Sequence, residues 1–196
     1  MRTAKLAAAA RSLKHSSGAS GAAFCLAFMT DQARAPHPEI IARAMPRGSA
    51  VILRDYKRPD KSALARRLRS ITEKNGSLLL IGADARLAQE IGADGVHYPS
   101  WAAVKPDNKG AIITAACHKA EDLMRAKDAG ANLAFLSPVF ATGSHPGADA
   151  LGAERFKALA AASPLPVIAL GGVDETNAST LRGKNVIGLA AISAFL

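Results

Sequence analysis

Two short segments near the C-terminus carry residues that could bind a phosphate group. Gly171 and Gly172 follow one apolar run, and Ile192 and Ser193 follow the last one. Paired glycines let backbone N–H groups approach an anion closely, and a helix expected to begin near Asp174 would add its positive N-terminal end. Because two such segments agree, we predict a phosphate site; the alternative is that the glycines only make a tight turn.

A long polar loop, residues 137–147, supplies further candidates. It holds Thr142, Ser144 and His145 among glycines and prolines. The hydroxyl groups could bind substrate, and the imidazole of His145 could transfer a proton near neutral pH. Long loops in compact domains are usually functional. We therefore predict a lid over a site, with a surface loop of no special role as the alternative.

Arg54 and His118 each follow an apolar run as well. Arg54 could hold phosphate oxygens with its guanidinium group. Alternatively, it could form a surface ion pair with Asp55. His118 stands where a barrel would place a catalytic or ligand-positioning group. Alternatively, His118 could cap the helix that follows. His97, after the fourth run, is a further candidate of the same kind.

The sequence does not predict a metal bound by the protein. His97, His118 and His145 are separated from carboxylates along the chain, and neither H-E-x-x-H nor C-x-x-C occurs. Asp84 alone is not a site. The two cysteines are too few for a disulfide framework, which fits a reducing, cytoplasmic setting.

Eight brief apolar runs alternate with helical stretches along the chain. Because these runs are continuous rather than alternating, both faces of each strand should be buried, as in a parallel sheet. The predicted strands are Phe24–Met29, Ala50–Leu53, Ser77–Ile81, Gly95–His97, Ala111–Ala115, Leu133–Leu136, Pro166–Leu170 and Val186–Ala191. The predicted helices between them are Pro38–Ala44, Lys61–Lys74, Ala85–Ile91, Lys119–Ala129, Ala153–Ala162 and Glu175–Leu181.

Repeated β-then-α units predict an α/β fold, specifically a small (β/α)8 TIM barrel over residues 24–196. The alternative is a doubly wound sheet, but no G-x-G-x-x-G follows the first run. The eighth helix is truncated, since the eighth run ends close to Leu196. Residues 1–23 are expected to form a basic helix, at about 3–14, and a linker. That helix or a neighbouring subunit could cover the gap.

Composition indicates a globular chain with anionic partners. Of 196 residues, 49% are hydrophobic and 21% charged, and the net charge is +9. Such a charge favours phosphorylated metabolites, nucleic acid or acidic lipid. The densest basic stretch, Arg54 to Arg69, lacks the interleaved aromatic residues of single-strand binding, and no apolar run reaches the roughly 18 residues of a membrane span. We therefore expect neither nucleic acid nor membrane as a partner.

Several of these segments together resemble the thiamine-phosphate synthase family, which includes the related thiazole tautomerases. The similarity runs from about Leu26 to Phe195, and its most specific part is the stretch from Leu87 to His97. The other matching segments are Leu26–Asp31, Val51–Asp55, Ser137–Thr142, Gly171–Val173 and Ile192–Ala194.

The resemblance implies an enzyme of thiamine biosynthesis, a transferase, built as a dimeric (β/α)8 barrel. Members join a pyrimidine methyl diphosphate to a thiazole phosphate and release pyrophosphate, with Mg²⁺ as cofactor. By resemblance, Arg54 meets the diphosphate, and the loops at Gly171, Gly172, Ile192 and Ser193 hold the thiazole phosphate. The implied partners are therefore phosphorylated thiazole and pyrimidine small molecules and a second copy of the chain.

At the positions that bind the metal in this family, the sequence differs from the family pattern. The family's Asn-Asp pair after the third strand corresponds to Gly82 and Ala83, and its second metal-binding Asp to about Ala102. Asp84 is shifted by one residue, and an expected lysine is displaced to Lys57. Mg²⁺ prefers carboxylate oxygens, which glycine and alanine cannot supply. The thiazole-phosphate half is thus kept while the metal half is altered.

Three hypotheses follow. In the first, the chain is the transferase, with Asp84, Lys57 or substrate-borne Mg²⁺ compensating for the missing ligands. In the second, it is a metal-independent isomerase like the tautomerases, with His118 or His145 moving the proton. The third is a non-catalytic phosphate-binding barrel. The transferase is preferred because Pro138 is the synthase-like residue where tautomerases carry histidine.

Overall fold

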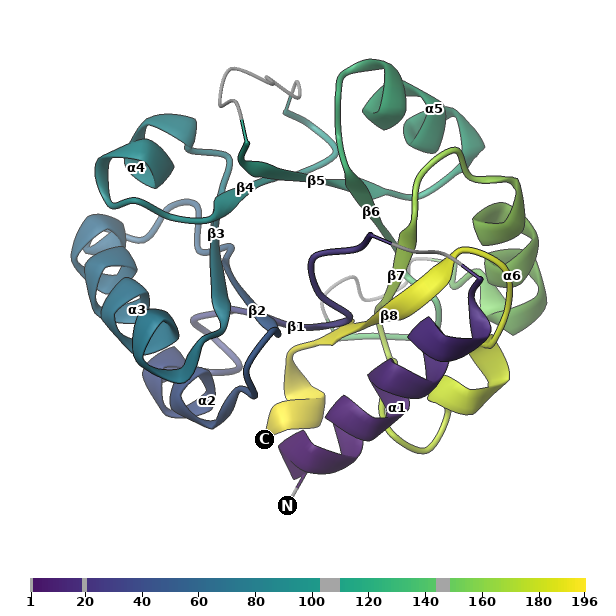
Figure 1. Cartoon of the computed structure of the whole chain (residues 1–196), viewed down its shortest axis with the longest axis horizontal. Coiled ribbons are helices and arrows are strands. Elements are labelled where there is room, and N and C mark those ends of the chain that lie inside the picture. The colour runs from purple at the N-terminus through teal and green to yellow at the C-terminus, as the bar shows by residue number, and fades with distance from the viewer. Residues whose placement is uncertain (1, 19–20, 103–109, 144–148) are drawn as a thin grey trace.

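Eight parallel strands close into a barrel, as predicted from the apolar runs. The computed structural model describes residues 2–18, 21–102, 110–143 and 149–196. The strands pair in sequence order and β8 pairs back to β1, which completes the (β/α)8 barrel and excludes the doubly wound alternative (Figure 1). They are β1 Leu26–Met29, β2 Ala50–Leu53, β3 Leu78–Gly82, β4 Gly95–Tyr98, β5 Ile112–Cys117, β6 Leu133–Leu136, β7 Val167–Leu170 and β8 Val186–Ala191.

The barrel buries both faces of its strands, which explains the continuous apolar runs. Alternate residues point inward and outward along each strand. The inward set fills the barrel with Phe24, Ala27, Met29, Ala50, Ile52, Leu80, Leu133, Phe135, Ile168, Ile187, Ala190 and Ile192. The outward set, such as Phe28, Leu53 and Leu79, packs beneath the surrounding helices. The interior is therefore solid, and a ligand has room only at an open end of the barrel.

The helices match the prediction except for the last. They are α1 Arg2–Ser16, α2 Pro38–Ala44, α3 Lys61–Asn75, α4 Ala85–Glu90, α5 Ala120–Asp128 and α6 Gly152–Ala162. The helix predicted at Glu175–Leu181 is wrong, because only a short 3₁₀ turn, η1 Ala178–Leu181, forms there. The Asp174 carboxylate accepts the backbone N–H groups of Thr176 and Asn177. Beyond them the chain takes the tighter 3₁₀ bonding, since the N–H of Thr180 donates to the Asn177 carbonyl at 3.0 Å.

Helix α1 packs on the outer face of β8, where an eighth barrel helix would lie (Figure 1). Leu6, Ala10 and Leu13 are buried in this contact layer. After β8 the chain forms only a 3₁₀ turn, η2 Ser193–Phe195, and the side chain of Arg2 donates to the carbonyl of Leu196. The expectation that the N-terminal helix covers the gap is confirmed, and both ends of the chain meet at the same place.

The longest helices, α1 and α3, have 15 residues each. Within the described residues, no helix has both the length and the apolar character to cross a membrane. The basic residues of α3 form ion pairs with neighbouring elements. Arg66 pairs with Glu90, Arg67 with Glu39 and Arg69 with Asp94. These contacts agree with the interpretation of this stretch as a solvated helix face.

Candidate active site

A cavity of about 410 Å³ opens at the end of the barrel where the strands finish. Function in this fold concentrates at that end, in the loops that follow the strands. The loops after β1, β2, β6, β7 and β8 all reach it. The residues predicted from the sequence that line it are Arg54, Thr142, Gly171, Gly172, Ile192 and Ser193. Ser144 and His145 lie outside the described residues.

The loop after β7 needs its two glycines. Gly171 and Gly172 have φ angles of 93° and 64°, in the left-handed region that side chains rarely adopt. A Cβ on Gly171 would lie 2.9 Å from Pro138 Cα, and one on Gly172 would lie 2.6 Å from the Ala141 carbonyl oxygen. The glycines therefore make a tight turn and also let the loop after β6 approach closely.

Three successive carbonyl groups of the β7 loop are engaged away from a ligand. Those of Leu170 and Gly171 accept the N–H groups of Val139 and Phe140, both at 2.9 Å. The Gly172 carbonyl accepts the side-chain amide of Asn177 at 2.8 Å. With these carbonyls occupied, the loop can present its N–H groups to an anion.

Backbone N–H groups from two loops are available at the cavity. Those of Gly172, Val173 and Ser193 donate to no acceptor within the part of the chain that the structure describes. Asn177 braces the loop further, since its Oδ1 accepts the N–H of Asp174 at 3.0 Å. Asn177 was not predicted from the sequence, although an Asp and an Asn three residues apart are typical of turns braced by side chains. The 3₁₀ turn η1 begins only at Ala178. The predicted contribution of a helix N-terminus near Asp174 to this site is therefore wrong.

The neighbouring side of the cavity, formed by the loops after β1 and β2, carries an ion cluster of Asp31, Arg34 and Arg54. Asp31 Oδ2 lies 2.7 Å from Nη2 of Arg34 and 2.7 Å from Nη2 of Arg54. Partial burial would raise the pKa of the Asp31 carboxyl, but its hydrogen bonds to Arg34 and the positive charges of both arginines lower it below its ordinary value. The suggested alternative partner of Arg54, Asp55, is wrong: Asp55 accepts the N–H of Gln32 at 2.8 Å instead.

Arg2 reaches the same cavity from the N-terminal helix α1. Its positive charge helps to lower the pKa of Asp174, whose largest influence is the hydrogen bond from Thr176. Neither Arg2 nor Arg34 was predicted from the sequence. No local pattern marks them, because they reach the cavity only after the barrel closes and α1 packs on β8.

His118 lies beside the cavity rather than among the residues that line it. Its Nδ1 is 2.7 Å from the carbonyl oxygen of Ser137, and a carbonyl can only accept, so Nδ1 carries the proton. Its backbone N–H donates to Asp122 Oδ2 at 2.8 Å. His118 thereby ties the start of the β6 loop to the end of β5, which suits a positioning group.

His97 belongs to the barrel interior. Its side chain is buried, with Nδ1 2.9 Å from Thr114 Oγ1 and the ring edge-on to Phe135. Burial, aided by the charge of Arg54, lowers the pKa of His97 to about 3. The imidazole is therefore neutral at physiological pH and packs as part of the core.

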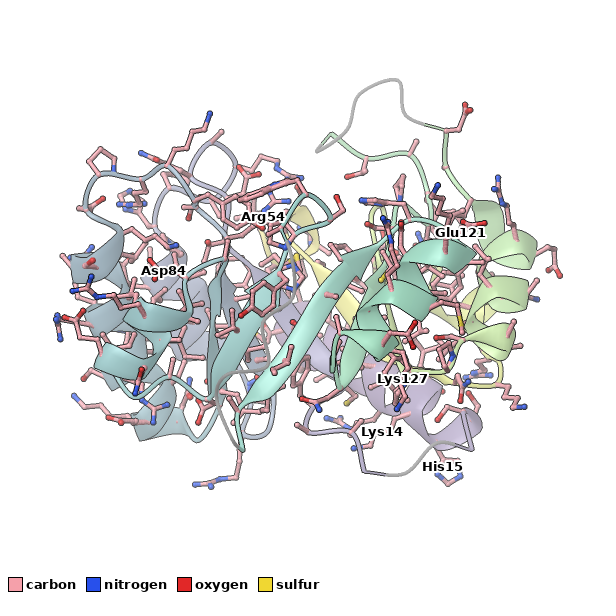
Figure 2. The ribbon with its side chains drawn as sticks, turned by 90° about the horizontal axis from the view of Figure 1, so that it is seen from above. Lys14, His15, Arg54, Asp84, Glu121 and Lys127 are labelled. Atoms are coloured by element: carbon pink, nitrogen blue, oxygen red, sulfur yellow. The ribbon has the colours of Figure 1, made fainter. Side chains whose placement is uncertain are left out.

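The donor groups do not fit a magnesium ion. Asp84 caps helix α4 by accepting the N–H of Leu87 at 2.9 Å and does not line the cavity; in Figure 2 it lies to the left of and below Arg54. At the end of β3, the Lys61 ammonium donates to the Gly82 carbonyl at 2.8 Å, so a cation already lies there.

Two further carboxylates near the cavity are engaged, while Glu175 also lines it. Asp31 is held by two arginines and Asp174 by its own loop. Lys57 is exposed and does not line the cavity. Among the described residues there is no group of three potential metal ligands. Compensation by Asp84 or Lys57 finds no support in this geometry.

Comparisons with known proteins agree on one family. The model of the family described as thiamine monophosphate synthase matches residues 26–195. The thiamine-phosphate synthase of Methanoculleus marisnigri is 34% identical over 167 residues, covering 81% of this chain and 79% of that protein. The thiamine-phosphate synthase of Chlorobium luteolum is 32% identical over 178 residues, covering 86% and 84%.

A solved structure shows the same fold. The thiamine phosphate pyrophosphorylase from Pyrococcus furiosus superimposes with a TM-score of 0.70 at 23% identity, covering 86% of this chain and 85% of that one.

Proposed function

The chain belongs to the thiamine monophosphate synthase family, and we propose that it condenses a pyrimidine methyl diphosphate with a thiazole phosphate to give thiamine phosphate and pyrophosphate. The observation that supports this most is the cavity itself. It is lined both by loops after β7 and β8, whose N–H groups at Gly172, Val173 and Ser193 donate to no acceptor among the described residues, and by the guanidinium groups of Arg34 and Arg54. A reaction between a monophosphate and a diphosphate needs two anion sites within one cavity.

The proposed chemistry is a substitution at the pyrimidine methylene carbon. The bond from this carbon to the diphosphate oxygen breaks, and its electron pair leaves with the oxygen. The lone pair of the thiazole nitrogen forms the new carbon–nitrogen bond, so the ring becomes a thiazolium cation. Groups already oriented toward the charge that develops on the leaving oxygen would supply most of the rate enhancement.

Each site residue then has a role. Gly171, Gly172, Ile192 and Ser193 hold the thiazole phosphate through their loops, and Arg54 meets the diphosphate.

The residues after β6 remain part of the same proposal. Thr142 lines the cavity and is proposed to bind substrate, as is Ser144, which lies in the same loop. His118 acts through Ser137 as a positioning residue, and His145 is proposed to act from the loop. Alanine variants of the two histidines test the proposal, because unchanged activity in both would remove them from the mechanism.

The isomerase alternative is not favoured. The named relatives are synthases, and the position where tautomerases carry histidine is Pro138. His118 binds the Ser137 carbonyl through Nδ1 and is not among the residues that line the cavity.

The decisive experiment measures thiamine phosphate formed by the purified protein from both substrates, with Mg²⁺ and then with EDTA. Product in either condition supports the transferase. No product in both, together with binding of the thiazole phosphate, would replace the transferase with a non-catalytic phosphate-binding barrel.

The remaining expectations belong to the same proposal. Residues 1–23 serve as an accessory helix and linker to a barrel of residues 24–196. A homodimer follows from the family resemblance, and light scattering of the purified protein tests it. A cytoplasmic location is consistent with the free thiols of Cys25 and Cys117.

A further inference from the structure

The β1–β2 side of the cavity presents the guanidinium groups of Arg34 and Arg54. The side chains of Arg34 and Arg54 are each 23% exposed and that of Asp31 is 18% exposed. Arg34 binds Asp31 through both Nε, at 3.1 Å, and Nη2, at 2.7 Å. This two-point contact fixes the plane of the guanidinium group.

Asp31 couples the two arginines into one unit. Its Oδ1 also accepts the backbone N–H groups of Ala33 and Arg34, both at 3.1 Å. Its Oδ2 is shared between the two guanidinium groups, so both cations are held on the same carboxylate. The backbone N–H of Arg54 is fixed in addition by Thr30 Oγ1 at 3.0 Å. The geometry of the pair is therefore set before a ligand arrives.

The cluster joins two guanidinium groups to one carboxylate, so Asp31 itself neutralises only one of the two positive charges. Arg54 has no carboxylate partner other than Asp31 among the described residues, and a guanidinium carries five N–H donors. A diphosphate offers several oxygens at the spacing that such donors recognise.

We propose that Arg34 and Arg54, joined by Asp31, neutralise the departing diphosphate in place of a magnesium ion held by the protein. The inference rests on the proposed function. The residues near the ends of β3 and β4 explain why arginines would replace a magnesium ion. Aspartates are absent at Ala83 and Ala102, Asp84 caps a helix, and the Lys61 ammonium lies at the end of β3. As the carbon–oxygen bond breaks, the oxygen takes both electrons, and guanidinium N–H groups stabilise its charge.

Calorimetric titration with inorganic pyrophosphate in EDTA tests this directly. The wild type is expected to bind pyrophosphate with the same dissociation constant in EDTA and in Mg²⁺, within about twofold. Arg34→Ala and Arg54→Ala should each weaken binding in EDTA by at least about tenfold, since a charged hydrogen-bond partner is lost. Arg86→Ala, an exposed arginine on α4 that does not line the cavity, is the matched control and should bind normally.

A conservative variant shows whether the planar geometry of the Arg34 guanidinium group matters beyond its positive charge. Arg34→Lys keeps the charge and the fold but loses the two-point contact with Asp31, so its binding in EDTA should stay weakened. Pyrophosphate binding that requires Mg²⁺, or that survives Arg34→Ala unchanged, would overturn the proposal. A protein that binds pyrophosphate in EDTA through these arginines yet forms no thiamine phosphate would refute the proposed function while upholding the arginine site.

Discussion

The two sides of the cavity attract negative charge by different means. On the β7–β8 side the donors are backbone N–H groups of Gly172, Val173 and Ser193, the first two in a turn that glycine geometry makes. On the β1–β2 side they are the side chains of Arg34 and Arg54, held by Asp31. A backbone site depends on the local shape of the chain, whereas a guanidinium site depends on ion pairs between distant residues. The two sides should therefore fail in different ways when altered.

The largest effect is expected from Gly172→Ala on the backbone side. The added Cβ would lie 2.6 Å from the Ala141 carbonyl oxygen at a φ of 64°. Relief of this contact must shift the loop, and the strain costs about 1–3 kcal/mol of folding free energy. We expect a lower melting temperature and loss of inorganic phosphate binding, measured by thermal unfolding and calorimetry.

Gly183→Ala is the control for that variant. Gly183 lies outside the left-handed region, and a Cβ there would come no closer than 3.6 Å to another atom, Lys157 Cγ. It should leave phosphate binding intact. Normal phosphate binding by Gly172→Ala would show that the close approach of the β6 and β7 loops is not needed for the site.

The next largest effect is expected from Asp31→Asn on the guanidinium side. The variant removes the negative charge shared by Arg34 and Arg54, so both guanidinium groups lose their fixed orientation. Pyrophosphate binding in EDTA should weaken by about tenfold while phosphate binding at the β7 loop changes little. Asp60→Asn, in the exposed pair with Arg58, is the control. Equal losses of both ligands would contradict the separation of the two sides.

Asp31 also makes stability depend on pH. Its pKa in the folded protein is below the ordinary value of 3.8, so its ionised form favours the folded state. The contribution is present above the unfolded pKa and is lost as the pH falls through the folded pKa. The difference in free energy of unfolding between wild type and Asp31→Asn should therefore reach its full value near neutral pH and disappear in acid. A difference that persists in acid would assign the effect to another cause.

A smaller effect is expected from Asn177→Ala. The variant removes the amide that binds the Gly172 carbonyl and the oxygen that accepts the Asp174 N–H. Loss of these partly exposed hydrogen bonds costs about 1 kcal/mol, so phosphate affinity should fall several-fold while pyrophosphate affinity is kept. Thr180→Ala, whose hydroxyl donates to the Asn177 carbonyl on the outer side of the same segment, is the control.

The smallest effect is expected from Arg2→Ala, which removes a charge that α1 brings to the backbone side. Arg2 is exposed, so solvent and salt screen its interaction. Phosphate affinity should fall about twofold at low ionic strength and the difference should vanish at high salt. Lys5→Ala, an exposed charge on the same helix that does not line the cavity, should have no effect. Equal salt-sensitive losses in both variants would point to the general charge of the helix.

The barrel could be predicted from local sequence patterns. Continuous apolar runs predicted all eight strands, because a strand buried on both faces leaves a local signal that does not depend on its partners. The Gly171–Gly172 pair marked the β7 loop in the same way, since its φ angles require glycine. The absence of aspartates at Ala83 and Ala102 was likewise visible in the sequence.

Tertiary structure alone decided how charge is arranged around the cavity. Arg2, Arg34 and Arg54 meet there only because the barrel closes from β8 to β1 and α1 packs over β8. The partners of Arg54 and His118, namely Asp31 and Ser137, lie 23 and 19 residues away along the chain. Local patterns cannot encode such pairs, since hydrogen bonds and ion pairs depend on distances that closure of the fold creates. The helix predicted after β7 is shortened to the 3₁₀ turn η1, in which the N–H of Thr180 donates to the Asn177 carbonyl three residues back.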